Sequence, residues 1–157
     1  MQSYKNSKPF FGDLHSHCEV GYGHGSLEDA FRNARLQLDF VAITVHAHWP
    51  EIPVNEPRLK DLADYHQRGF QNASQGWEKL QKTVSENYHP GRFVPFLAFE
   101  WHSNQYGDHN IYFNGEKGEI IRANSIEALR NDIKEWQKKG IDAIATKTVS
   151  LNLHLSG

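Results

Sequence analysis

The sequence predicts an α/β fold built around a mostly parallel sheet. Short, continuous apolar runs alternate along the chain with segments whose apolar residues recur at helical spacing. Such runs are typical of strands buried on both faces, as strands in a parallel sheet usually are. The chain has 157 residues and no internal repeat, so we expect a single domain spanning residues 1–157.

The first half of the chain contains two predicted strands and two predicted helices. Residues 10–14 form a short apolar run that predicts the first strand, and 40–45 form a longer one that predicts the second. Between them, Ser26 resembles an N-cap and precedes an apolar stripe at helical spacing. After a proline-rich loop, residues 58–87 carry a long apolar stripe that predicts a helix, which its two glycines are expected to bend or split.

The second half contains three further predicted strands and one helix. Residues 93–99 predict a buried strand, and 110–114 predict a shorter strand that ends in a turn. Ser125 is expected to cap a helix that stops at Gly140, and 141–146 predict one more buried strand. This order of elements implies a largely parallel sheet that includes one hairpin.

Charge and hydropathy exclude several functional classes. The net charge is −2, so the chain has no excess of basic residues of the kind that binds nucleic acid or an anionic membrane surface. No apolar run approaches the length of a membrane span, and residues 1–9 lack the apolar core of a signal peptide. A single cysteine fits a reducing compartment. We therefore expect a cytoplasmic location.

Metal-ligand residue types gather where the predicted strands end. His15 and His17 follow the first strand, His46 follows the second, Glu100 follows the third, and His109 precedes the short strand. Ligands of parallel α/β folds bind beyond the carboxyl ends of the strands, so we expect these side chains to converge. Imidazole and carboxylate ligands suit zinc, manganese or iron. One His-x-His pair alone is weak evidence, and the prediction depends on several strand ends agreeing.

Other histidines and aromatic residues have simpler interpretations. His66 and His89 lie in helical or loop context, and we interpret both as surface residues. Trp49, Trp101 and Tyr106 lie near the strand ends, where they could line a pocket for an organic group. Simple packing is the commoner role for such residues.

The strand-end motifs resemble those of the PHP superfamily, named for polymerase and histidinol phosphatase domains. Gly12–His17 resembles the first motif, and Asp39–His46 resembles the second. Phe99–Trp101 together with Gly107–Asn110 resembles the third. The similarity covers about residues 10–146 and is greatest to an uncharacterised bacterial PHP-like branch.

The resemblance implies a distorted (β/α)7 barrel that holds up to three divalent ions, commonly zinc, manganese or iron. Characterised members hydrolyse phosphoesters. His15 and His17 would then bind one ion, Glu100 would bridge two, and His46 and His109 would complete the neighbouring sites. Glu100 and His109 are the implied catalytic residues.

Two departures from the family pattern affect the ligand set. His24 stands where the family usually has an aspartate, and it is included as a predicted metal ligand. Val45 replaces an aspartate that precedes the second-motif histidine, and its presence is expected to weaken His46. His48, two residues further on, offers a second imidazole that could compensate.

A third departure concerns the end of the chain. The later motifs of the family are absent, and Lys147-Thr148-Val149 stands where a histidine is expected. Residues 151–154 do not resemble a fourth motif. We therefore expect the chain to be a C-terminally truncated, N-terminal half of a larger barrel, completed by a missing segment or by oligomerisation.

The leading functional prediction is a metal-dependent hydrolase that acts on a small-molecule phosphoester, with a metal-bound hydroxide as nucleophile. One alternative is an amidohydrolase-type enzyme, which commonly uses a bridging carbamylated lysine. Lys147 is the one lysine that follows a predicted strand. The other alternative is a non-catalytic metal-binding fragment or remnant.

Overall fold

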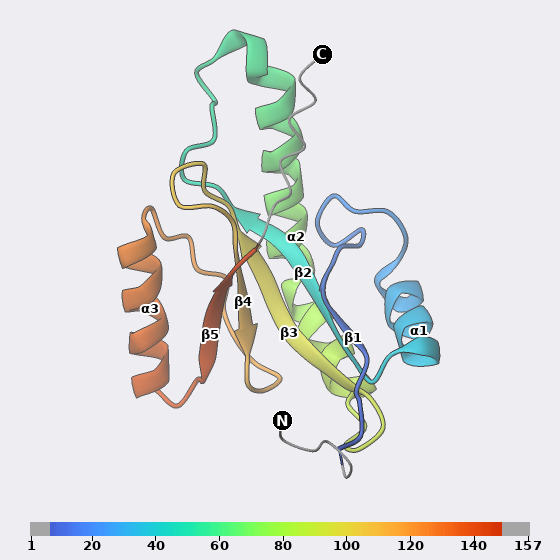
Figure 1. Ribbon diagram of the computed structural model, residues 1–157. Coiled ribbons are helices and arrows are strands. Elements are labelled where there is room, and N and C mark those ends of the chain that lie inside the picture. The colour runs from blue at the N-terminus through green and yellow to red at the C-terminus, as the bar shows by residue number, and fades with distance from the viewer. Residues whose placement is uncertain (1–6, 149–157) are drawn as a thin grey trace.

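Five strands form one sheet whose spatial order follows the chain. The structure is a computed structural model that describes residues 7–148. Figure 1 shows the sheet as strongly twisted, with β1 and β5 at its two edges. The strands are β1 (Gly12–Ser16), β2 (Phe40–His48), β3 (Val94–Trp101), β4 (His109–Phe113) and β5 (Ala143–Lys147).

The sheet is mixed, so the predicted mostly parallel sheet is not confirmed. β1, β2 and β3 pair in parallel, whereas β4 pairs antiparallel with both β3 and β5. The cause is the short connection 102–108, because a parallel crossover needs a dozen or more residues. β4 therefore returns as a hairpin, and β5 again runs in the direction of β1–β3.

Three α-helices cover the sheet, and two of them begin at the predicted caps. They are α1 (Leu27–Gln37), α2 (Lys60–Asn87) and α3 (Ile126–Lys138), and a short 3-10 turn, η1 (Pro57–Leu59), leads into α2. Ser26 accepts a hydrogen bond from the backbone of Asp29, and Ser125 accepts one from Ala128. These bonds satisfy amide groups that have no partner within the helix. No helix in residues 7–148 is both long and apolar enough to cross a membrane.

α2 runs as one helix through its two glycines, so the predicted split is wrong. A Cβ atom at Gly69 would lie 2.0 Å from the ring of Tyr22, and one at Gly76 would lie 2.7 Å from Val20. The glycines therefore make room for the loop between β1 and α1.

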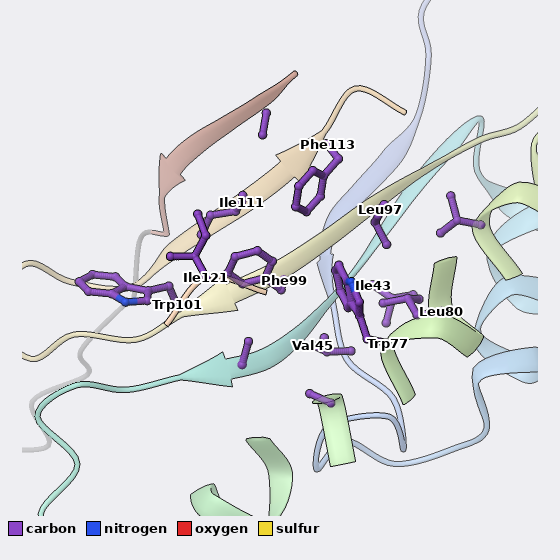
Figure 2. Packing of buried hydrophobic residues seen from close by; sticks show 14 of the residues in the cluster. Ile43, Val45, Trp77, Leu80, Leu97, Phe99, Trp101, Ile111, Phe113 and Ile121 are labelled. Atoms are coloured by element: carbon purple, nitrogen blue, oxygen red, sulfur yellow. The ribbon is translucent and has the colours of Figure 1, made fainter. Parts of the chain in front are cut away.

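The hydrophobic core lies between the helices and one face of the sheet. Figure 2 shows Ile43 and Val45 of β2 gathered with Trp77 and Leu80 of α2, next to side chains of β3 and β4. On α3, Trp136 packs 5.2 Å from the ring of Phe113 in the same core. Because side chains alternate along a strand, the residues between these core positions face the other side of the sheet.

β5 is far less buried than predicted. Ala143 is buried, but the four residues that follow it in the strand are exposed. β5 is an edge strand, so it lacks a neighbour on one side. The interpretation of residues 151–154 concerns positions outside the described part of the chain.

Candidate metal centre

The carboxyl ends of the three parallel strands bring four of the predicted ligands together. His15 lies near the end of β1, and His17 lies one residue beyond it. His46 and Glu100 are direct partners in the parallel register of β2 and β3. The side chain of Glu100 lies close to imidazoles from β1 and β2. The expected convergence at the strand ends is therefore present.

A first group consists of His15, His17 and Glu100. The Nε2 atoms of the two histidines lie 3.0 Å apart. His15 Nε2 is 3.9 Å from one carboxylate oxygen of Glu100, and His17 Nε2 is 3.9 Å from the other. The carboxylate thus presents a separate oxygen to each imidazole.

A second group consists of His46, Glu100 and His102. His46 Nδ1 lies 3.0 Å from Glu100 Oε2 and 2.5 Å from His102 Nε2. His102 Nε2 is 3.9 Å from the same carboxylate oxygen. Glu100 is therefore common to both groups.

These distances are compatible with the binding of a divalent cation by the residues of each group. Ligand atoms lie about 2.0–2.2 Å from zinc, so two ligands of one ion are at most about 4.4 Å apart. Every pair described above is closer than this limit. Three protein ligands for each ion also match catalytic zinc sites, which keep a further position open.

Glu100 provides independent support for this fit. Its side chain is 4% exposed, and its Oε2 atom lies 3.0 Å from His46 Nδ1. An ionised carboxylate is costly to bury unless positive charge compensates for it. Cations held by the two histidine groups would supply that charge.

Burial keeps the imidazoles of His17 and His46 neutral, as metal ligands must be. Burial, with a further contribution from His46, lowers the pKa of His17 to about 4. Burial also lowers the pKa of His46, although Glu100 opposes the shift. Both rings therefore have a free nitrogen lone pair at neutral pH.

Glu100 is held in its ionised form by its neighbours. Burial alone raises the pKa of its carboxyl group. The interactions with His46, His102 and His15 together exceed this effect, so the pKa lies below its ordinary value. The site therefore combines neutral imidazoles at His17 and His46 with a charged carboxylate at Glu100.

His24 does not join either group. It is exposed, in the loop before α1, and it lines a cavity of about 360 Å³ that His17 also borders. The structure thus places His24 near the centre but does not support its predicted role as a ligand.

His109 lies on the opposite side of the sheet from Glu100. Its ring packs 5.9 Å from that of Trp101, which belongs to the helix-covered face of β3, and its Nδ1 atom is 2.8 Å from the Gly107 carbonyl oxygen. The next residue, Asn110, faces the cluster instead and contacts His15. This geometry does not support the predicted catalytic and metal-binding role of His109.

The residues beside His46 also differ from expectation. Val45 is 1% exposed and points into the core, so a carboxylate at this position would not touch the cluster. The presence of valine therefore gives no reason to expect a weaker His46. His48 belongs to neither group, and its Nε2 atom is buried without a hydrogen-bond partner among the described residues.

His102 is the candidate ligand that sequence reasoning missed. It is 8% exposed and follows β3 directly, two residues after Glu100. The signal was present in the sequence, because residues at i and i+2 of an extended segment share a face. The same spacing identified His15 and His17.

An aromatic side chain from the loop before α1 covers part of the cluster. The ring of Tyr22 stacks 4.0 Å from that of His46, and its hydroxyl group lies 3.0 Å from His66 Nδ1. His66 is therefore half-buried beside the site, and its interpretation as a surface residue is wrong. Trp101 has the expected packing role, with its ring nitrogen donating to the Ala123 carbonyl oxygen.

A scan against protein-family models and a search among curated proteins found no match to this chain. We therefore infer the function from the geometry of the cluster.

Proposed function

We propose that this protein is a metal-dependent hydrolase of the PHP type that acts on small-molecule phosphoesters. The observation that carries the proposal is that Glu100 belongs to both groups of histidines. A carboxylate shared by two groups is the arrangement expected of a two-ion centre. Such centres are common in enzymes that transfer or hydrolyse phosphoryl groups.

The chain's own residues have distinct roles in this proposal. His15 and His17 hold one cation, His46 and His102 hold the other, and Glu100 joins them. A bound pair of cations supplies a water molecule of lowered pKa and positive charge for phosphoryl oxygens. The low pKa of His17 keeps this ligand neutral throughout the neutral range.

The shared carboxylate favours phosphoesters over amides. An amidohydrolase-type centre commonly has a carbamylated lysine between its metal ions, whereas Glu100 has the shared position here. Lys147, at the end of β5, is exposed and belongs to neither group. A phosphoester also brings negative charge, which a two-cation centre attracts.

Hydrolysis assays on the purified chain test this proposal. We expect p-nitrophenyl phosphate or its diester to be hydrolysed with Zn²⁺ or Mn²⁺, with kcat/KM at least about 100-fold lower in Glu100→Gln. Glu119→Gln, at an exposed position, is the matched control and should retain wild-type activity. Cleavage of a p-nitroanilide in place of either ester would favour the amidohydrolase alternative. Bound metal without turnover of any of these substrates would indicate a non-catalytic metal-binding protein.

A further inference from the structure

Two residues that flank His109 lie directly behind ligand histidines of the candidate centre. Asp108 Oδ1 is 3.4 Å from His102 Nδ1, and Asn110 Nδ2 is 2.6 Å from His15 Nδ1. In both histidines, the opposite ring nitrogen faces the cluster. Each flanking residue therefore contacts the ring atom that points away from the ion site.

The contact of Asp108 fixes the proton of His102. An ionised carboxylate only accepts hydrogen bonds, so the proton of the neutral imidazole belongs on Nδ1. The Nε2 lone pair of His102 is then directed at the cluster. Asp108 is itself held in place, because its Oδ1 atom also accepts a hydrogen bond of 3.1 Å from the backbone N–H of Ser103.

Asn110 behaves differently because an amide group can donate or accept. With its NH₂ group next to His15 Nδ1, the amide favours a proton on Nε2, where an ion would bind. Turning the amide over would place its oxygen at Nδ1 and favour the ligating form. Asn110 therefore permits both tautomers of His15, whereas Asp108 permits one tautomer of His102.

We propose that Asp108 and Asn110 are positioning residues of the metal centre, and that Asp108 makes the group of His46, Glu100 and His102 the higher-affinity cation site. This inference rests on the proposed two-cation function. Carboxylates behind metal-bound histidines orient the ring and raise its basicity, and their removal typically weakens metal binding about 10–100-fold. Within residues 7–148, the group of His15, His17 and Glu100 has no such carboxylate behind its histidines. It therefore binds its cation with lower affinity and is filled second.

Titration of the metal-free chain with Zn²⁺ measures the order of filling. We expect two binding steps, the tighter of which weakens about 10–100-fold in Asp108→Asn, while the weaker step changes little. Asp132→Asn removes the same charge from an exposed position on α3 and should leave both steps unchanged. Thermal unfolding of each variant verifies that it is folded.

Nitrogen NMR of the metal-free protein provides a readout that a general loss of packing would not produce. The wild-type spectrum should show His102 with its proton on Nδ1, and Asp108→Asn should reduce that population. Asn110→Asp, which can only accept, should move the His15 proton to Nδ1 and strengthen the weaker Zn²⁺ step. Asn104→Asp adds the same charge at an exposed position of the preceding loop and should do neither.

The outcomes separate the two proposals. Failure of the folded wild-type chain to bind Zn²⁺ would contradict the proposed two-cation function. Two-step binding that is unaltered in Asp108→Asn and Asn110→Asp, with unchanged histidine tautomers, would overturn the positioning roles alone.

Discussion

At the scale of single residues, the candidate centre depends on a balance between burial and charge. Glu100 is buried yet ionised because nearby imidazoles lower its pKa more than burial raises it. His17 remains neutral because burial outweighs its attraction to Glu100. Both effects favour the protonation states that metal binding requires.

The low pKa of His17 predicts that the metal-free protein loses stability in mild acid. The pKa is about 4 in the folded chain and about 6.5 in an unfolded one. The unfolded state therefore binds this proton more readily, so the stabilisation is complete above about pH 6.5 and is lost as the pH falls toward 4. We expect the free energy of unfolding to fall by roughly 2 kcal/mol from this residue after solvent screening.

Urea unfolding in the presence of a chelator, at pH 7 and pH 4.5, measures this effect. His17→Asn should have a smaller pH-dependent loss than the wild-type chain, whereas His89→Asn, at an exposed position, should behave like wild type. Equal losses in wild type and His17→Asn would show that His17 is not held neutral by the fold.

The sequence predicted the candidate ligands well at the carboxyl ends of the parallel strands. The rule that ligands gather at the carboxyl ends of parallel strands led to His15, His17, His46 and Glu100, which the structure brings together. Nearness in sequence alone led to His109, which alternation along β4 places on the core side. Applying the i and i+2 rule to Glu100 would have found His102.

At the scale of elements, α2 positions the loop between β1 and α1, which covers part of the candidate centre. Tyr65 donates a hydrogen bond to the Tyr22 carbonyl oxygen, and Asn72 donates one to that of Gly21. Gly69 leaves space for the Tyr22 ring, which covers His46. The loop between β1 and α1 is thereby fixed over the cluster.

Gly69→Ala tests this role of the helix. Alanine alone would improve helix propensity by about 1 kcal/mol, but its Cβ would overlap the Tyr22 ring. Overpacking of this kind costs about 1–3 kcal/mol, so we expect a net loss of stability together with weaker Zn²⁺ binding. Unfolding and metal titration measure the two effects.

Gln75→Ala, at an exposed position of the same helix, is the matched control and should change neither property. A stabilised Gly69→Ala protein with unaltered Zn²⁺ binding would contradict the packing of Tyr22 against α2. The two glycines were interpreted from sequence as helix breakers because their contacts are with a loop distant in sequence. Local patterns do not report such contacts.

At the scale of the whole molecule, the hydrophobic core and the ligand side chains of β2 and β3 lie on opposite faces of the sheet. The apolar periodicities predicted every strand and helix to within a few residues, because burial against the helix layer fixes that pattern. Periodicity does not specify strand direction, which follows from the length of the connection after β3. The mixed character of the sheet was missed for this reason.

The face of the sheet opposite the hydrophobic core has an apolar region away from the cluster. A cavity of about 510 Å³ lies there, lined by side chains that include Leu14, Phe96, Tyr112 and Ile144. Leu14 and Ile144 are 43% and 58% exposed, respectively, and exposed apolar patches often mark contact surfaces.

Metal content tests the central claim, which is that Glu100 joins two cation sites and that His109 serves neither. The measurement is elemental analysis of the purified chain after loading with Zn²⁺ and removal of excess ion, for wild type, Glu100→Gln and His109→Ala. The structure predicts two equivalents in wild type and in His109→Ala, and strong loss of both in Glu100→Gln. Folded wild-type protein without zinc, or His109→Ala that loses zinc while Glu100→Gln retains it, would contradict the account.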